Sequence, residues 1–347
     1  MTEHFIKNIE IKNFKCFEDF KAEGFGRVNL IGGKNNVGKT AFMEACYISK
    51  SNTIQNLYER LLEIDSHRNI INNLILNKGR RQNLQDLINA NKSISIFNQK
   101  VYYNEEMDDE MTSGLTMIQF EKEIGLIEIH THEESIEMMV DDEQDKITYS
   151  KLIEILDISF SETSHKFTQN FISQYSNSNE ELENIIGQSK LDNKYDTLNK
   201  YLLEVFDISN IDIIKNKPMI KSNGDYKELS FFGQGIKAFI NIVSSILTLK
   251  NDIIYLDEIE NGIHYTNLDK LWEIILTISK QQNVQVFATT HSKECIESYA
   301  RVAKKLEDEE IAFIELCRRE KEIKAFVYPY DWFIDEIEQE HEVRGCL

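Results

Sequence analysis

The stretch Gly33-Lys34-Asn35-Asn36-Val37-Gly38-Lys39-Thr40 decides how the rest of the chain is interpreted. It fits the P-loop pattern of a glycine, four residues, a second glycine, a lysine and a serine or threonine. Residues 27–31 before it predict a short buried strand, and residues 41–46 after it predict the first turns of a helix. This strand–loop–helix order points backbone N–H groups and a helix N-terminus at an anion. The stretch therefore predicts a phosphate-binding loop rather than a chance match on a glycine turn.

The P-loop assigns a nucleotide-binding role to each of its residues. Lys39 is expected to reach the β and γ phosphates of ATP, and the Thr40 hydroxyl is expected to bind Mg²⁺. The cofactors predicted are therefore ATP and Mg²⁺. The residues expected to contact the nucleotide are Gly33, Lys34, Asn35, Asn36, Val37, Gly38, Lys39, Thr40 and Ala41.

Two acids end a second apolar run. Asp257 closes residues 253–256 and is the expected second ligand of Mg²⁺, and Glu258 directly after it is the expected general base for an attacking water. A buried strand that ends in two carboxylates is costly unless a cation lies there. The alternative is an acidic strand end that faces solvent.

A histidine follows a third apolar run. His291 lies just past residues 284–288, in the stretch Phe287-Ala288-Thr289-Thr290-His291-Ser292. Taken alone, a histidine at a strand end is more often structural. After a P-loop and an acid pair, we expect His291 to contact the γ phosphate or the attacking water, which makes it a second catalytic residue beside Glu258.

A serine and two glycines open a helix that is apolar nearly all round. The stretch is Leu229-Ser230-Phe231-Phe232-Gly233-Gln234-Gly235. A helix N-terminus of this composition can bind an anion. We expect Ser230, Gly233 and Gly235 to contact the γ phosphate of ATP held by another molecule. The alternative is an ordinary N-cap with glycines for the turn.

Composition sets the broad class of the protein. The chain has 347 residues, a formal net charge of −20 and a hydrophobic share of 41%. The hydrophobic share supports a folded core of one large domain or two ordinary ones. The charge argues against a surface that coats nucleic acid nonspecifically, since such binding neutralises phosphates. The acidic clusters are either solvated faces or a docking surface for a basic partner.

Cysteine spacing and hydropathy indicate the cellular compartment of the protein. The five cysteines are far apart and form no CxxC pair, so they are predicted to be reduced thiols rather than a disulfide frame or a zinc site. No signal peptide is present, and no apolar run approaches the length of a bilayer span. We therefore expect a cytoplasmic protein without membrane contact.

Hydrophobic periodicity divides the chain into a core and a middle region. Residues 1–50 and 226–347 alternate strand and helix patterns and predict an α/β core. Within residues 51–225, the period-two pattern over about 93–140 predicts an antiparallel β meander. The pattern over about 151–206 predicts a helical insertion. No heptads are sustained, which excludes long coiled-coil arms.

Together these motifs resemble an ABC-type ATPase. The P-loop serves as Walker A, residues 230–235 as the signature, Asp257-Glu258 as Walker B and His291 as the switch histidine. The stretches Asp257-Glu258-Ile259-Glu260-Asn261-Gly262-Ile263-His264 and Thr289-Thr290-His291-Ser292, with the closing Glu342-Val343-Arg344, resemble the AAA15/AAA21 branch of SMC-, RecF- and OLD-like ATPases. The resemblance covers residues 1–50 and 226–347. The middle region resembles the family only in its position.

The resemblance implies a fold and an assembly. The fold would be a P-loop NTPase with an ABC-type head, an antiparallel β meander lobe and a helical insertion. Such heads form homodimers, head to tail, around two ATP molecules, so that each ATP meets the P-loop of one subunit and the signature of the other. Asn261 and His264 would then lie in the loop that faces the partner.

The resemblance also implies a role. Members of this branch often act in prokaryotic anti-phage defence, as in PARIS and RloA-like systems, where the ATPase holds or releases a separate nuclease. Too few residues follow His291 for a nuclease domain of usual size. We therefore expect a slow ATPase that acts as a nucleotide-gated switch for a partner effector. Residues 51–225 are expected to set partner specificity.

Two departures and two alternatives accompany this interpretation. Phe231-Phe232 stand where the transporter signature has a single glycine, and the Q-loop glutamine is not assigned among Gln82, Gln99 and Gln119. The first alternative is a RecF- or SMC-like DNA-repair ATPase that binds nucleic acid. The second is a scaffold that binds ATP without hydrolysing it, which the full set of hydrolytic residues disfavours.

Overall fold

The computed structural model describes most of the chain. The described residues are 5–64, 86–89, 94–97, 115–121, 126–131, 133–139, 146–148, 156, 170–172, 179–215, 217–222, 224–319 and 322–339. Gln82, Gln99 and the closing Glu342-Val343-Arg344 lie outside these ranges.

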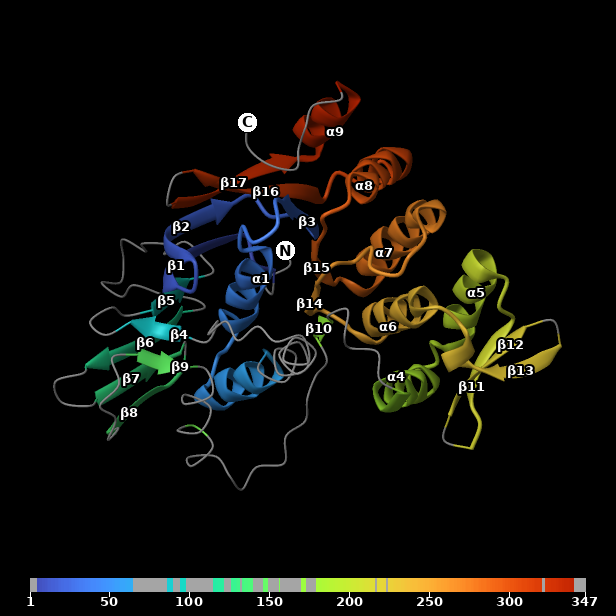
Figure 1. Ribbon diagram of the computed structural model, residues 1–347, viewed down its shortest axis with the longest axis horizontal. Helices are drawn as coiled ribbons and strands as arrows, with labels where there is room; N and C mark the ends of the chain where they lie inside the picture. Colours follow the sequence, from blue (N-terminus) through green and yellow to red (C-terminus); the bar gives the residue numbers. More distant parts are fainter. Residues whose placement is uncertain are drawn as a thin grey trace, which may run out of the picture.

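A six-stranded sheet forms the centre of the molecule (Figure 1). Its strand order is β10 (Phe171–Ile172), β14 (Ile253–Leu256), β15 (Gln285–Thr289), β3 (Val28–Gly33), β16 (Ile311–Arg319) and β17 (Glu322–Pro329). The first five strands are parallel, and β17 pairs with β16 as an antiparallel hairpin. The strands predicted directly before the P-loop, before Asp257 and before His291 are confirmed. Their carboxyl ends lie at one edge of the sheet.

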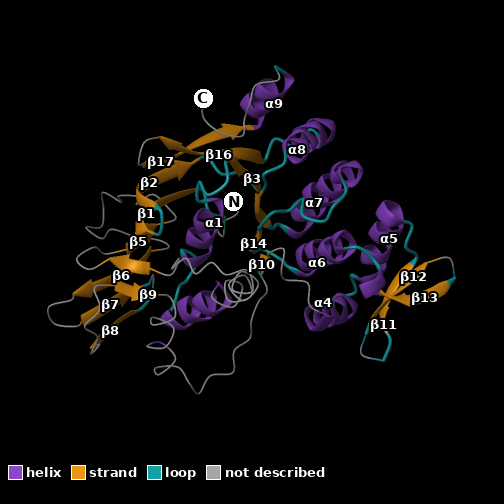
Figure 2. Cartoon of the chain, in the orientation of Figure 1, coloured by secondary structure: helices purple, strands orange, loops and turns teal. Residues whose placement is uncertain are grey.

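Both faces of the core sheet are covered, as Figure 2 shows. Helices α6 (Gln234–Thr248), α7 (Leu268–Gln282) and α8 (Lys293–Leu306) lie on one face, and α1 (Lys39–Ile48) lies on the other. Ile254 and Leu256 of β14 pack in the first layer, whereas Ile253 and Tyr255 pack in the second. A strand that is buried on both faces reads as a continuous apolar run, which is why the sequence located β14 and β15 so closely.

A second six-stranded sheet contains the predicted meander. Its antiparallel order is β2 (Phe17–Glu23), β1 (Asn8–Phe14), β5 (Ile94–Phe97), β6 (Leu115–Glu121), β7 (Leu126–His130) and β8 (Ser135–Met139). The meander is confirmed in β5 to β8. Ile11 of β1 pairs with Ile96 of β5, so the meander shares its sheet with the N-terminal strands. A separate pair, β4 (Asp86–Asn89) and β9 (Lys146–Thr148), lies in the same part of the chain.

The predicted helical insertion contains a strand. Helices α4 (Asn179–Leu191) and α5 (Tyr195–Phe206) agree with the prediction, but β10 at Phe171–Ile172 does not. A strand of this length shows no periodicity, and its pairing comes from β14, which is distant in sequence. The prediction was wrong there because tertiary pairing, not local pattern, forms this strand.

A buried carboxyl group joins this insertion to the core. Residues 54–64 are helical, and their Glu63 accepts hydrogen bonds from the Tyr47 hydroxyl of α1 and from the Phe171 N–H at 3.3 Å. Arg60 lies over the Tyr47 ring, at 4.3 Å from its centroid. The helix that follows α1 is thus held against both α1 and β10.

A small sheet precedes the signature stretch. Its strands are β11 (Asn210–Ile213), β12 (Pro218–Ser222) and β13 (Asp225–Glu228). The expected boundary between residues 225 and 226 falls inside β13, because the sheet ends directly before the 3₁₀ turn η1 (Leu229–Phe231) and α6. Figure 1 shows this sheet beyond α5, at the opposite end of the molecule from β5 to β8. The C-terminal helix α9 (Tyr330–Glu338) packs against α8 and the β16–β17 hairpin.

Two further expectations were tested by the structure. Within the described ranges, no helix has the length and hydropathy needed to cross a membrane. Cys16, Cys46 and Cys295 are free thiols as expected. Cys317 is bonded in a disulfide, so the prediction of reduced thiols was wrong for this residue.

Candidate functional site

The P-loop connects the central strand of the core sheet to α1, as the sequence predicted. Gly33 ends β3 with φ +138°, and Gly38 precedes α1 with φ +107°. A Cβ at Gly33 would lie 2.5 Å from the Leu316 carbonyl oxygen, and one at Gly38 would lie 2.7 Å from the Cys16 sulfur. Backbone conformation and space therefore both require glycine. No side chain caps α1, which leaves its first N–H groups available to an anion.

Lys39 lies inside the loop. Its ammonium donates to the carbonyl oxygens of Gly33 at 2.9 Å and Lys34 at 3.1 Å, and the residue is only 6% exposed. Burial lowers the pKa of Lys39, and the charges of Asp257, Glu258 and Glu260 oppose that shift. A cation held in this way can exchange its carbonyl contacts for phosphate oxygens without leaving the loop.

The Walker A and Walker B residues meet in space. The Thr40 hydroxyl lies 3.3 Å and 3.2 Å from the two carboxylate oxygens of Asp257, and the Thr289 hydroxyl donates to Oδ1 of Asp257 at 2.6 Å. Burial raises the pKa of Asp257, and the hydrogen bonds from the two threonines act against that rise. No role for Thr289 was predicted from the sequence. The available signal was a pair of threonines directly after an apolar strand.

The Thr40–Asp257 contact fits a magnesium ion. A hydroxyl and a carboxylate are hard oxygen ligands, and Mg²⁺ is usually bound by one or two protein groups together with phosphates and water. No group of three or more His, Cys, Asp or Glu residues that could hold a metal occurs in the described part of the chain. The hydroxyl and carboxylate at Thr40 and Asp257 are donors that suit a nucleotide-bound Mg²⁺.

Glu258 and His291 form a pair beside this contact. His291 Nε2 lies 3.0 Å from Glu258 Oε1, and both side chains are about one third exposed. The Glu258 N–H donates to the Thr289 hydroxyl at 2.8 Å. Glu258 has φ +54°, a conformation that non-glycine residues rarely adopt and that is often found at functional sites. The structure thus brings together the two residues predicted to be catalytic.

A third acid of the same loop, Glu260, was quoted in the sequence but given no role. Its Oε1 accepts the N–H of His291 at 2.8 Å and the N–H of Ser292 at 3.2 Å. The only sequence signal was an acid three residues after Asp257. Of the glutamines proposed for the Q-loop, Gln119 lies in β6 and pairs with Glu128 in the outer sheet.

The signature stretch differs from the P-loop in its surroundings. Ser230 is exposed and its hydroxyl donates only to Glu228, at 3.3 Å. Gly233 is the N-cap of α6, and a Cβ there would meet nothing within 4 Å. A Cβ at Gly235 would lie 2.0 Å from the Gly262 carbonyl oxygen. Gly235 is therefore explained by close packing against the loop after Walker B. Within the described residues, no hydrogen bond joins this stretch to the P-loop.

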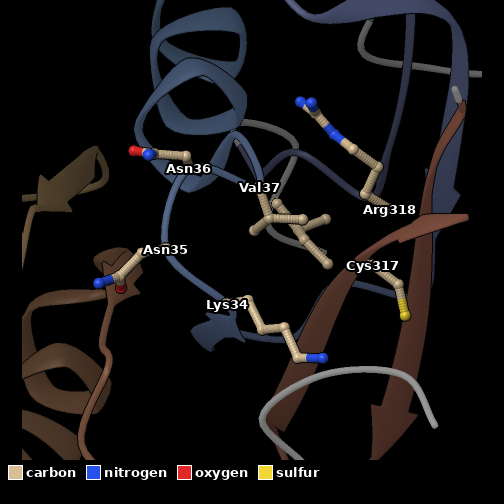
Figure 3. A pocket seen from close by; sticks show the side chains of 7 residues that line it. Lys34, Asn35, Asn36, Val37, Cys317 and Arg318 are labelled. Carbon is tan, nitrogen blue, oxygen red and sulfur yellow. The ribbon is translucent and has the colours of Figure 1, made fainter. Parts of the chain in front are cut away.

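A cavity of about 260 Å³ lies on the β16 side of the P-loop (Figure 3). The side chains of Lys34 and Arg318 extend from its two walls, whereas Asn35 and Asn36 point away. The residues that line it are Lys34, Asn35, Asn36, Val37, Leu316, Cys317 and Arg318. Neither Walker B acid contributes to the lining, so the cavity is separate from the Thr40–Asp257 contact.

These features define a P-loop NTPase with an ABC-type head. Residues 152–297 match the AAA_21 family, described as AAA domain, putative AbiEii toxin, Type IV TA system. This match covers less than half of the chain, and together with the fold it supports a P-loop ATPase, which confirms the predicted fold class and ATPase activity.

Two relatives were found by sequence comparison. The chain is 27% identical over 331 residues to an ATP/GTP phosphatase of Helicobacter pylori, covering 84% of this chain and 86% of that protein. It is 32% identical over 104 residues to the DNA replication and repair protein RecF of Bacillus cytotoxicus, covering 29% of this chain and 26% of that protein.

Among solved structures, an Smc head bound to the C-winged helix domain of ScpA matches with a TM-score of 0.50 and 15% identity, covering 94% of this chain and 99% of that chain. At this identity the likeness concerns the fold alone.

Proposed function

We propose that two copies of this ATPase close head to tail around two ATP molecules and act as a nucleotide-gated switch. The switch controls a separate effector, a nuclease, in prokaryotic defence against phage. One observation carries the proposal, namely the division of the phosphate-binding groups. Those of the P-loop and Walker B meet at one edge of the sheet, whereas Ser230 and Gly233 are exposed and, among the residues that the structure describes, form no hydrogen bond with the P-loop.

Binding of ATP uses the groups that already meet. The open N–H groups of α1 and the Lys39 ammonium hold the β and γ phosphates. Thr40 and Asp257 would hold Mg²⁺, which when bound would neutralise charge on the phosphates. The Thr289 hydroxyl fixes Oδ1 of Asp257, and the Thr40 hydroxyl lies within hydrogen-bond distance of both oxygens of this carboxylate.

We assign hydrolysis to Glu258 and His291, the partly exposed pair. The Glu258 carboxylate orients and deprotonates the water that attacks the γ phosphate. His291, 3.0 Å away, fixes the carboxylate and lies where it can also contact that phosphate. The strained backbone of Glu258 places the base beyond the end of β14, at the edge where the phosphates bind.

The second copy supplies the signature. Phe231 is 80% exposed beside Ser230, and Tyr265 is 67% exposed in the 3₁₀ turn η2 (Tyr265–Asn267) next to His264. Large exposed aromatics are typical of surfaces that a partner covers. Because Phe231 adjoins the signature serine and His264 and Asn261 share the loop after Walker B, the surface suits the same head-to-tail contact.

The proposed roles of the two parts of the chain follow from this division of the phosphate-binding groups. Residues 1–50 and 226–347 are assigned to the ATPase core, and residues 51–225 to the lobe that recognises the effector. In the Smc structure, a head of similar fold is bound to a separate winged-helix domain. By analogy, the effector of this protein would be a second polypeptide that contacts the head and responds to its opening and closing.

The decisive experiment is Glu258→Gln. Because glutamine cannot accept the proton of the water, phosphate release should fall by about 100-fold or more. ATP binding should persist, and the dimer should accumulate, as measured by light scattering after gel filtration with saturating ATP. A variant that stayed monomeric under these conditions would contradict the head-to-tail model. Separately, purified wild type that cut DNA alone, with cutting lost in this variant, would contradict a separate effector.

The RecF match favours one alternative, a DNA-repair ATPase that closes on duplex DNA. This alternative predicts binding to duplex DNA that ATP strengthens. Higher salt concentrations should weaken this binding steeply, since contacts to phosphates release counterions. A gel-shift titration across salt concentrations, with and without ATP, decides between the two functions.

A further inference from the structure

Two loops carry the proposed catalytic pair, and one carboxylate joins them. Glu258 belongs to the loop after β14, and His291 belongs to the loop after β15. Oε1 of Glu260, in the first loop, accepts the N–H of His291 at 2.8 Å and that of Ser292 at 3.2 Å in the second. The Ile259 N–H also donates to the Thr289 carbonyl oxygen at 3.1 Å. The two loops therefore form one hydrogen-bonded unit.

Glu260 lies at the N-terminus of a helix in this unit. Ser292 is the N-cap of α8, and its hydroxyl accepts the Cys295 N–H at 3.1 Å. A carboxylate at a helix N-terminus is stabilised by the free N–H groups and by the helix dipole. The second oxygen, Oε2, is buried and has no hydrogen-bond partner in the described part of the chain. The strong interactions of Glu260 are thus those with the His291 loop.

The catalytic geometry depends on this junction. His291 meets Glu258 through a single ring contact at 3.0 Å, and Glu258 is already fixed by its N–H bond to Thr289. The imidazole position then follows from the His291 backbone, which Glu260 holds. Loss of the hydrogen bonds to Glu260 would therefore move the His291 ring and leave the P-loop unchanged.

We propose that Glu260 is a positioning residue for ATP hydrolysis, which holds the His291 backbone so that the imidazole meets the Glu258 carboxylate. The inference rests on the proposed function. It predicts that the hydrogen-bond acceptor matters more than the charge.

The test compares two substitutions at this position. Glu260→Gln keeps an oxygen that can accept both N–H groups, whereas Glu260→Ala removes it. A displacement of about 1 Å in a catalytic group can cost about 100-fold in rate. We therefore expect kcat of the alanine variant to fall by about 10- to 100-fold and that of the glutamine variant to stay within about threefold of wild type. The Kd for ATP should change by less than about threefold in both, because Lys39 and Thr40 are untouched.

Three further measurements separate positioning from a folding defect. The matched control is Glu297→Ala, which removes an exposed acid of α8 that pairs with Lys293 at 3.5 Å and should leave kcat unchanged. Amide exchange at His291 and Ser292, measured without ATP, should quicken in Glu260→Ala and not in Glu260→Gln. The pH–rate profile of Glu260→Ala should differ in shape from wild type, since the Glu258–His291 contact is altered.

The outcomes distinguish this inference from the proposed function. Wild-type protein that releases no phosphate from ATP overturns both. If wild type and Glu258→Gln behave as proposed while Glu260→Ala keeps the wild-type kcat or unchanged amide exchange, only the role of Glu260 is overturned. A glutamine variant as slow as the alanine variant overturns it as well, because the charge rather than the acceptor would then be what matters.

Discussion

Two regions of the molecule differ in how completely a single chain builds them. The phosphate edge comprises the P-loop, residues 33–40, and Asp257, and the signature turn comprises residues 230–235. At the phosphate edge, Lys39 is buried and hydrogen-bonded, and Asp257 is held by two threonines. At the signature turn, Ser230 has one weak contact and Phe231 is 80% exposed. Buried polar groups are fixed by their hydrogen bonds, whereas exposed ones are free to take new partners.

This difference explains why one site is preorganised and the other is not. The phosphate edge must place a cation, a base and a metal ligand together before ATP arrives, which requires a rigid frame. In the proposed dimer, the signature turn would have to release its ligand each time the dimer opens. An exposed turn with few contacts of its own suits that task. The predictions below test the contrast, beginning with the largest expected effect.

Removal of the buried cation should have the largest effect. Lys39→Ala deletes the ammonium that would contact two phosphates, and each charged hydrogen bond contributes about 1.5–3 kcal/mol. ATP affinity should fall by about 1,000-fold, as measured by titration with a fluorescent ATP analogue. Lys21→Ala is the control, because Lys21 is an exposed cation of β2, outside the P-loop, and its loss should leave affinity within about threefold. Equal losses in both variants would show that the phosphate edge is not preorganised.

Buried charge also distinguishes the two regions. The acid beside the signature turn, Glu228, is exposed and paired with Lys217, whereas Glu63 behind α1 is buried. Burial raises the pKa of Glu63 from 4.5 to about 7, against the hydrogen bonds from Tyr47 and Phe171 and the charge of Arg60.

The raised pKa of Glu63 predicts a pH dependence of stability. Between pH 4.5 and 7 the folded chain keeps this proton and the unfolded chain releases it. The free energy of unfolding should therefore fall by about 3 kcal/mol as pH rises through this window. Glu63→Gln keeps an oxygen acceptor without the charge, so the variant should lack this part of the slope. Urea unfolding of both proteins from pH 4.5 to 8 measures it, and parallel profiles would contradict the prediction.

The two signature glycines should respond differently to alanine. A Cβ at Gly235 would lie 2.0 Å from the Gly262 carbonyl oxygen, so Gly235→Ala should destabilise the fold by about 1–3 kcal/mol. Gly233 has φ −62° and open space around it, so Gly233→Ala should change stability by less than about 0.5 kcal/mol.

Thermal unfolding and ATPase assays separate the roles of these glycines. If Gly233 contacts the ATP of the second subunit, Gly233→Ala should slow phosphate release while the monomer stays as stable as wild type. An alanine at Gly233 that left turnover unchanged would remove this glycine from the proposed interface. Equal destabilisation by the two substitutions would contradict the described difference between them.

Much of the phosphate edge could be predicted because its parts are local in sequence. The P-loop, the acids after β14 and the histidine after β15 each follow a continuous apolar run, and parallel strands bring their carboxyl ends to one edge. The spacing alone thus located Lys39, Asp257 and His291.

Other features could not be predicted because they depend on contacts between distant residues. The pairing of β1 with β5 and of β10 with β14 joins segments that no local pattern relates. The hydrogen bonds of Glu260 to the His291 loop, and those of Thr289 to Asp257, exist only once β14 and β15 are adjacent. Gly235 is an instructive case, since it packs closely against Gly262, a contact that the sequence did not predict.

The contact between Glu63 and Phe171 has a consequence for how such proteins diversify. It joins, at 3.3 Å, the point where the chain leaves the ATPase core after α1 and the point where it returns at β10. A segment whose two ends are adjacent can be enlarged or exchanged without separating the parts that it connects. The edge of β1, which pairs with β5, sets one condition, because any replacement must cover it. One ATP-driven head can therefore be fitted with recognition modules for different targets while its own sheet stays intact.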